Sequence, residues 1–66
     1  MFVRRRRVRI HQLDPAPTIE GLLVRSVNGH YRLLKPVIWE TADRSHPLEG
    51  EGWIPKGRVV FLETVR

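Results

Sequence analysis

The sequence predicts an all-β protein, built as a small five-stranded antiparallel barrel or half-barrel of SH3-like or OB-like type. Short segments rich in β-branched residues are separated by Pro, Gly, Asn and Asp, and no long stretch keeps the apolar period of a helix. A central Asn-Gly dipeptide indicates a tight hairpin. With 66 residues and no cysteine, the chain is expected to form one small domain, 1–66, without disulfides.

The first predicted strand lies in a basic N-terminal segment, 1–13, expected as a strand or an arm. Strict alternation places two apolar residues on one face and a basic row on the other: Val8 and Ile10 against Arg5, Arg7, Arg9 and His11. Arg4 and Arg6 fall on the apolar face, so the regular strand is expected to begin near Arg6. Two prolines within 14–17 end it, because each removes a backbone donor.

Segments 18–27 and 30–37 are predicted to pair as a hairpin around Asn28-Gly29, since both residues accept the positive φ of a type I′ turn. A two-residue loop places Val27 opposite His30, and an unbroken register continues to Val24 opposite Leu33 and Leu23 opposite Leu34. The expected core face is the one without a cation in its middle: Leu22, Val24, Tyr31 and Leu33, with Glu20 at its far end. The other face mixes apolar and basic residues: Ile19, Leu23, Val27 and Leu34 with Arg25, His30 and Arg32.

Residues 40–52 are polar and are predicted to form one long loop. A short strand over 53–55 and a tight turn at Lys56-Gly57 follow, and 58–65 is the final strand. Alternation places Val59, Phe61 and Val65 on one side of that strand, and Val60 and Leu62 on the other. Because both sides are apolar near the middle, both are expected to be covered.

Two phrases within 21–62, GLLVRSVNGHYRLL and GWIPKGRVVFL, resemble small SH3-like or OB-like β-barrel proteins of phages and mobile elements. In such chains an apolar hairpin leads through a Trp-Ile-Pro-Lys step to a last strand. The resemblance implies the barrel alone, because the functions of such proteins are mostly undefined.

The positive charge is concentrated at one end of the chain. Twelve Lys and Arg against seven Asp and Glu give a net charge of +5, and five arginines lie within the first nine residues. From Asp14 onward, cations and acids balance. A concentrated basic segment on a neutral body predicts binding to DNA or RNA, mainly through phosphates and with little sequence specificity.

The candidate nucleic-acid-binding residues are the basic segment, dispersed cations and one aromatic residue: Arg4, Arg5, Arg6, Arg7, Arg9, His11, Arg25, Arg32, Lys35, Trp39, Lys56 and Arg58. Trp39, at the entry to the long loop, is expected to be exposed and available for stacking. Trp53, beside Ile54, is expected in the core. A solvated N-terminus that only aids solubility is the simpler alternative.

A protein-interaction or assembly module is the second functional hypothesis, such as a phage or mobile-element accessory protein that binds a host or virion protein, or a homodimer. The second apolar face motivates it, because a lone barrel of this size has difficulty covering that face. The candidate protein interface comprises Leu23, Leu34, Val60 and Leu62.

Enzymatic activity, metal binding and cofactors are not expected. His11, His30 and His46 lack metal-ligand spacing. Asp43, Ser45 and His46 carry the residue types of a triad, but neighbours in one loop do not converge readily on a reacting atom. No small-molecule substrate is expected. No apolar stretch approaches the length of a membrane span or a signal sequence, so a cytoplasmic location is expected, nucleoid-associated if the ligand is DNA.

Overall fold

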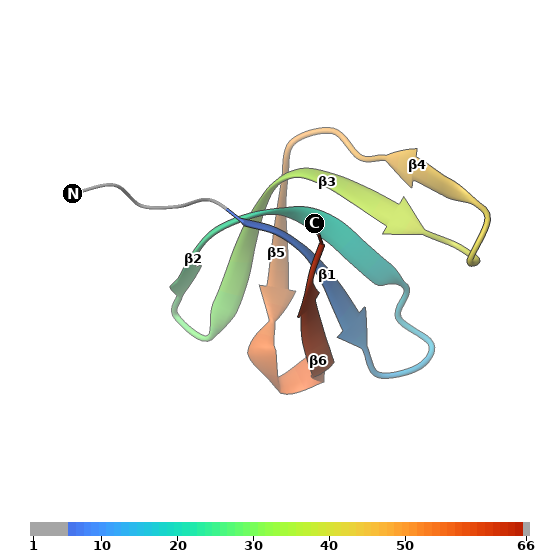
Figure 1. The fold of residues 1–66 in the computed structure, drawn as a ribbon. Helices are drawn as coiled ribbons and strands as arrows, with labels where there is room; N and C mark the ends of the chain where they lie inside the picture. The colour runs from blue at the N-terminus through green and yellow to red at the C-terminus, as the bar shows by residue number, and fades with distance from the viewer. Residues whose placement is uncertain (1–5, 66) are drawn as a thin grey trace.

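The computed structural model describes residues 6–65, which form six antiparallel strands and one 3-10 turn, with no α-helix in that range (Figure 1). The elements are β1 (Arg6–Gln12), β2 (Thr18–Val27), β3 (His30–Trp39), β4 (Ser45–Pro47), β5 (Glu51–Pro55), η1 (Lys56–Arg58) and β6 (Val59–Thr64). The all-β class is therefore confirmed, with six strands instead of five. No helix in the described range is long and apolar enough to span a bilayer.

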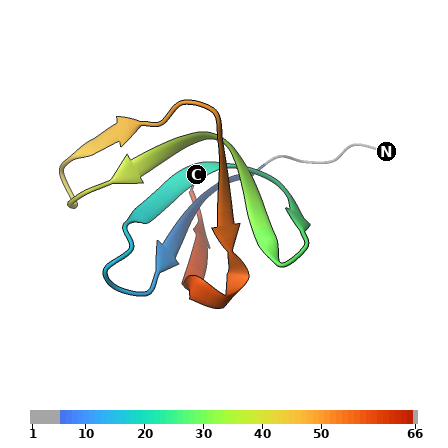
Figure 2. The same cartoon turned by 180° about the vertical axis from the view of Figure 1, so that it is seen from behind.

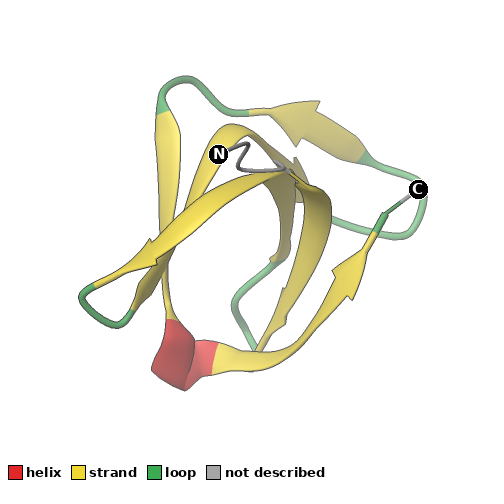
Figure 3. Cartoon of the chain, turned by 60° about the vertical axis from the view of Figure 1, so that its left-hand side comes forward, coloured by secondary structure: helices red, strands yellow, loops and turns green. Residues whose placement is uncertain are grey.

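The strands follow the order β4-β3-β2-β1-β6, and β5 pairs with the other half of β3 (Figure 2). The sheet curves so strongly that β5 and β6, joined by η1, stand on either side of an opening (Figure 3). Within residues 6–65 these two strands do not pair. The sheet thus does not close into a barrel, and the closed form of the expected fold is wrong.

β1 follows its sequence pattern. The strand begins at Arg6, and Val8 and Ile10 are buried, as predicted. These two residues form the core with Ile19, Leu33 and Ile54. Because Val8 and Ile10 point inward, alternation places Arg7, Arg9 and His11 on the outer side of the sheet.

The hairpin between β2 and β3 turns at Asn28 and Gly29, whose φ angles of 48° and 74° confirm the predicted turn. Val27 pairs with His30, also as predicted. Beyond Arg25, however, a bulge leaves Val24 unpaired and places Leu23 opposite Leu33. A bulge inserts one extra residue and reverses the faces that follow it.

This bulge corrects the expected core face. Leu33 is buried and Tyr31 packs against the core, as predicted. Ile19 and Leu23, expected on the opposite face, also belong to the core cluster, whereas Leu22 and Val24 do not.

A second bulge lies in β3, where Lys35 and Pro36 stand opposite Gly21. Lys35 has a φ of 50°, which is uncommon for a residue with a side chain. A Cβ on Gly21 would lie 3.0 Å from the Leu34 carbonyl oxygen. Glycine therefore permits the two strands to approach where the sheet bends.

The C-terminal half differs most from expectation. Residues 40–52 are not one loop, because β4 pairs with β3 and β5 begins at Glu51. Trp53 is 51% exposed, so its placement in the core was wrong. In β6, pairing to β1 skips Val60, and Phe61 is consequently exposed on the side away from Val59. The expectation that Phe61 shares a covered face with Val59 is wrong.

Candidate functional site

The outer face of β1 holds a buried carboxylate between two arginines. Arg7 Nε donates to Glu20 Oε2 at 2.6 Å, and Arg9 Nε donates to Glu20 Oε1 at 3.0 Å. In the Arg9–Glu20 ion pair, Arg9 Nη2 lies 2.9 Å from the same Oε1. Trp39 Nε1 donates to the same Oε1 at 3.3 Å, and Arg9 Cζ lies 4.7 Å from the Trp39 ring centroid. We call these four residues the Glu20 cluster.

Cross-strand register explains the Glu20 cluster. Glu20 on β2 stands directly opposite Arg9 on β1 and opposite Val37 on β3. Arg7, two residues from Arg9, reaches Glu20 diagonally on the same face. The Glu20 side chain is 7% exposed, whereas those of Arg7 and Arg9 are 44% and 34% exposed. The carboxylate therefore lies beneath guanidinium groups that still face solvent.

Burial and hydrogen bonding act on the pKa of Glu20 in opposite directions. Burial alone would raise this pKa, because it penalises the charged carboxylate. Hydrogen bonds and charge from Arg7 and Arg9 outweigh burial and hold the pKa of Glu20 below its ordinary value of 4.5. Glu20 is thus an anion at neutral pH, and the Glu20 cluster carries one net positive charge.

The arginines keep donors for a further partner. Within residues 6–65, Arg7 uses only Nε, so its two Nη groups have no acceptor there. A guanidinium has five N–H groups in a fixed fork. Glu20 binds one side of each guanidinium group and fixes its orientation. The remaining N–H donors face solvent or the groove described below.

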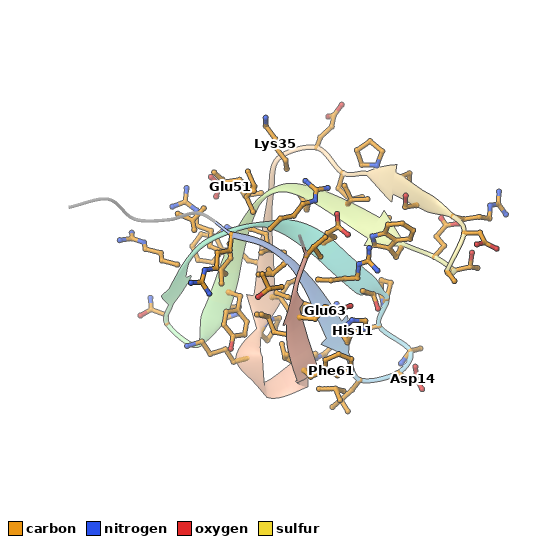
Figure 4. All side chains as sticks on the ribbon, in the orientation of Figure 1. His11, Asp14, Lys35, Glu51, Phe61 and Glu63 are labelled. Carbon is orange, nitrogen blue, oxygen red and sulfur yellow. The ribbon has the colours of Figure 1, made fainter. Side chains whose placement is uncertain are left out.

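A second group lies beside the Glu20 cluster where β1 meets β6. Phe61 stacks on His11 with ring centroids 4.1 Å apart and planes 14° from parallel. His11 Nε2 lies 2.8 Å from Glu63 Oε1, and its Nδ1 lies 3.4 Å from Thr18 Oγ1. Figure 4 shows His11, Phe61 and Glu63 together near the Asp14 turn. Phe61 remains 53% exposed, so the ring face away from His11 is open.

A groove of about 540 Å³ adjoins both groups. Its floor comes from β1, β2 and β3, and its walls are the turn after β1 and the segment after β3. The lining residues are Arg9, His11, Asp14, Pro15, Ala16, Pro17, Thr18, Trp39, Glu40, Thr41 and Ala42. The groove therefore combines Arg9 and His11 with the Trp39 indole, and it also holds two carboxylates, Asp14 and Glu40.

The structure brings only part of the predicted nucleic-acid set together. Arg7, Arg9, His11 and Trp39 meet on one face. Arg6 begins β1 and is exposed, whereas Arg4 and Arg5 lie outside the described residues. Trp39 is half-buried and not fully exposed as expected. Lys35 lines a hollow of about 400 Å³ together with Arg7. The other predicted residues lie elsewhere in the fold: Arg25, Arg32, Lys56 and Arg58.

These remaining residues do not extend the Glu20 cluster. Arg25 and Arg32 are paired positions near the hairpin turn, which lies across the sheet from the 13–17 turn (Figure 1). Arg32 makes a two-bond ion pair with Glu51 at 2.9 and 2.6 Å. Figure 4 shows Lys35 and Glu51 well separated from His11 and Phe61.

The pair Arg32–Glu51 has its own electrostatics. Hydrogen bonds from Arg32 hold the pKa of Glu51 below its ordinary value, and Glu51 raises the pKa of Arg32. Lys56 Nζ lies 5.2 Å from the Tyr31 ring centroid. Arg58 is exposed beside the turn after β1 and lines a separate hollow with Leu13.

Sequence reasoning missed four members of the site, Glu20, Glu63, Phe61 and Thr18. Glu20 carried a signal, since it is an acid next to the apolar residues of β2, but its partners depend on the register of β1 with β2. Phe61 reaches the surface because of the bulge at Val60, which alternation does not reveal. No cluster of three His, Asp or Glu able to hold a metal occurs within residues 6–65.

The predicted protein interface differs in exposure from residue to residue. Leu23 and Leu62 are half-buried and pack against the core. Leu34 is half-buried. Val60 is 57% exposed and is the one member of the predicted set that lies open on the surface.

Comparison with known proteins gives no family for this chain. No protein-family model matches it, and no curated protein or solved structure is similar to it. The resemblance to small β-barrel proteins of phages and mobile elements therefore stays a prediction, and function must be argued from the site itself.

Proposed function

We propose that the chain is a non-enzymatic nucleic-acid-binding protein that contacts phosphates through the outer face of β1. One observation carries the proposal: Glu20 holds Arg7 and Arg9 side by side while each remains partly exposed. Arginines in a fixed orientation lose little side-chain entropy when they bind phosphate, and their fork matches phosphate oxygens. Arg4 and Arg5, which precede β1 in the sequence, add two further positive charges to the basic segment.

The Glu20 cluster limits how strong this binding can be. Glu20 cancels one of its two guanidinium charges, so the described part of β1 is less basic than the sequence suggests. Glu63 offsets His11 in the same way when that histidine is protonated. Moderate, salt-sensitive affinity with little sequence preference is therefore expected, because phosphate contacts position a ligand without reading its bases.

The test must remove the guanidinium groups without leaving Glu20 buried and unpaired. Replacing Arg7, Arg9 and Glu20 together by Gln keeps neutral hydrogen-bonding groups at all three positions. If both arginines contact phosphate, this variant should bind a labelled oligonucleotide more weakly. The slope of log K against log salt should fall in magnitude by about 1.4 on a single strand or about 1.8 on a duplex.

A matched control makes the same changes of charge elsewhere. Arg25→Gln with Arg32→Gln and Glu51→Gln removes two arginines and one carboxylate on the hairpin side of the sheet and should change the salt slope much less. Equal losses in the two variants would show that net charge alone matters and would contradict a site on β1. A wild-type slope near zero would contradict nucleic-acid binding altogether.

The connectivity supports an SH3-like arrangement within this proposal. β1, β2, β3 and β5 follow as antiparallel neighbours, and η1 returns the chain so that β6 pairs with β1. In a small curved sheet of this kind, the outer face of the first strand and its adjoining loops are accessible to a large ligand.

Protein interaction is the second candidate function, favoured by the edge strand β6. In the described part of the chain β6 pairs with β1 alone, and both Val60 and Phe61 are exposed on it. An apolar edge strand is a template for another strand, so a second copy or a partner protein would pair here. Sedimentation at rising concentration tests this function: self-association should occur and be lost in Val60→Lys, whereas a strict monomer that captures no partner would contradict it.

A further inference from the structure

We infer that the ligand of this face is single-stranded nucleic acid, bound across β6, β1 and β3 with its bases on Phe61 and in the groove beside Trp39. This inference rests on the proposed function and adds the form of the nucleic acid. Four residues carry it, and we call them the aromatic-basic row: Phe61, His11, Arg9 and Trp39.

The aromatic-basic row is continuous. Phe61 stacks on His11 at 4.1 Å, His11 and Arg9 follow each other on the outer face of β1, and Arg9 lies 4.7 Å from the Trp39 ring. From β6 to β3 the row crosses three strand spacings, about 14 Å. A ligand that contacts both ends must therefore be a chain that crosses the strands.

Phe61 offers the first stacking surface. One ring face lies against His11, which fixes the ring, and the residue is still 53% exposed. A large apolar ring held open to water lowers stability and needs a reason in a chain with only five aromatic residues of the Phe, Trp and Tyr types. Stacking of a base on Phe61 would cover that face, and such stacking tolerates any base.

Arg9 and Trp39 offer the second surface. Glu20 accepts a hydrogen bond from Arg9, and the guanidinium lies over the face of the Trp39 indole. Unpaired bases stack on guanidinium planes as well as on aromatic rings. The adjoining groove, about 540 Å³, lies within the roughly 300–1,000 Å³ of typical small-ligand sites, so it can accept one unstacked nucleoside.

A duplex fits these features less well. Its bases are stacked on one another, so neither Phe61 nor Arg9 could reach a base face. Phosphate attraction alone is weak here, because Glu20 and Glu63 offset the cations. Base stacking therefore supplies binding free energy that phosphate attraction does not, because the net charge of this face is low.

The experiment measures anisotropy of labelled dT12, labelled rU12 and a labelled 12-base-pair duplex at one salt concentration. We expect dT12 or rU12 to bind at least tenfold more tightly than the duplex. Phe61→Ala should weaken binding to the single strand by about 5- to 100-fold, as loss of one stacked base does. The same substitution should leave duplex binding unchanged. The comparison of dT12 with rU12 shows whether a 2′-hydroxyl matters.

Two further variants keep the test decisive. Val60→Ala removes the neighbouring exposed side chain and should leave binding to dT12 unchanged. Trp53→Phe leaves Trp39 as the single tryptophan, whose fluorescence should be quenched on titration with dT12. Thermal melting of each variant excludes loss of the fold as the cause.

The outcomes separate this inference from the proposed function. Equal affinity for duplex and single strand, or a Phe61→Ala variant that binds dT12 normally, overturns the inference while phosphate binding by Arg7 and Arg9 stands. Failure of all three probes to bind overturns both. Loss of dT12 binding in Val60→Ala to the same degree as in Phe61→Ala also overturns it, since the edge of β6 rather than the ring would then be responsible.

Discussion

Arg7 Nε donates a 2.6 Å hydrogen bond to Glu20 Oε2 across the first two strands. The guanidinium group of Arg7, which is predicted to bind nucleic acid, therefore also stabilises the fold. Glu20→Gln should therefore destabilise the protein at neutral pH, by about 1–3 kcal/mol. The lower end is expected, because Arg7 and Arg9 remain 44% and 34% exposed and are screened by water. Urea unfolding at pH 7 measures the difference, and an unchanged midpoint would contradict a stabilising role.

The same carboxylate predicts a pH dependence. Because the pKa of Glu20 lies below its ordinary value of 4.5 in the folded protein, its contribution to stability is complete above about that pH. The contribution is lost as the pH falls through the lower folded value. The difference in unfolding free energy between wild type and Glu20→Gln should thus be constant from pH 7 to about 5 and shrink below 4.5. A difference that grows in acid would contradict this sign.

Gly21→Ala should destabilise the bend in the sheet. The new methyl group would lie 3.0 Å from the Leu34 carbonyl oxygen and 3.1 Å from Leu33 Cβ, and neither can move without shifting backbone or core. A cost of about 1–3 kcal/mol is expected from overpacking. Gly57→Ala is the matched control, since nothing lies within 4 Å of its added Cβ. Equal thermal midpoints for the two variants would show that the approach at Gly21 is not tight.

Ile10 tests the position of the core. It is fully buried, so Ile10→Val should cost about 0.5–1.5 kcal/mol through lost packing. Val60→Ala, at a position 57% exposed, should stay within about 0.5 kcal/mol of wild type. Chemical unfolding of both variants checks the contrast, and a larger loss at Val60 would mean that the edge of β6 is covered in solution.

The two tryptophans should respond differently to a soluble quencher. Trp53 is 51% exposed, whereas Trp39 is half-buried beneath Arg9. Acrylamide should therefore quench Trp39→Phe, which retains Trp53, more steeply than Trp53→Phe, which retains Trp39. The reverse order would favour the arrangement that the sequence alone suggested.

Local chemistry made part of this fold predictable. Asn28 and Gly29 accept positive φ, so the central turn and its first pairs follow from two residues. Val8 and Ile10 alternate with basic residues, which correctly indicated the two faces of β1. In both places the local sequence is sufficient to predict the local structure, because no contact with a distant segment overrides it.

The bulges limited how well the alternation of apolar and polar residues could predict which side chains face the core. A strand pattern with a period of two assumes an unbroken ladder, but Val24, the Lys35-Pro36 step and Val60 each interrupt it. Each interruption depends on how curved strands fit over a common core, which is a property of the assembled sheet. The core positions of Leu23 and Leu62 and the exposure of Phe61 follow from these interruptions.

The candidate site was predictable only as a set of cations. The sequence placed Arg7, Arg9 and His11 on one face, but it did not provide their partners. Glu20 reaches the arginines through the register across the 13–17 turn, and Glu63 reaches His11 through pairing of segments far apart in the chain. Such partnerships need the register of each ladder, which the turn residues alone do not determine.

The pairing of β1 with β6 joins Val8 to Thr64, nearly the full span of the chain. The hairpins can form early, because their residues are close in sequence. The β1–β6 ladder is expected to form later, because closing a long loop costs chain entropy before any stabilising contact is made. We therefore expect Phe61 to meet His11 late in folding. A kinetic intermediate that retains the hairpins would lack the ligand-binding face, so recovery of binding should lag behind recovery of secondary structure during refolding.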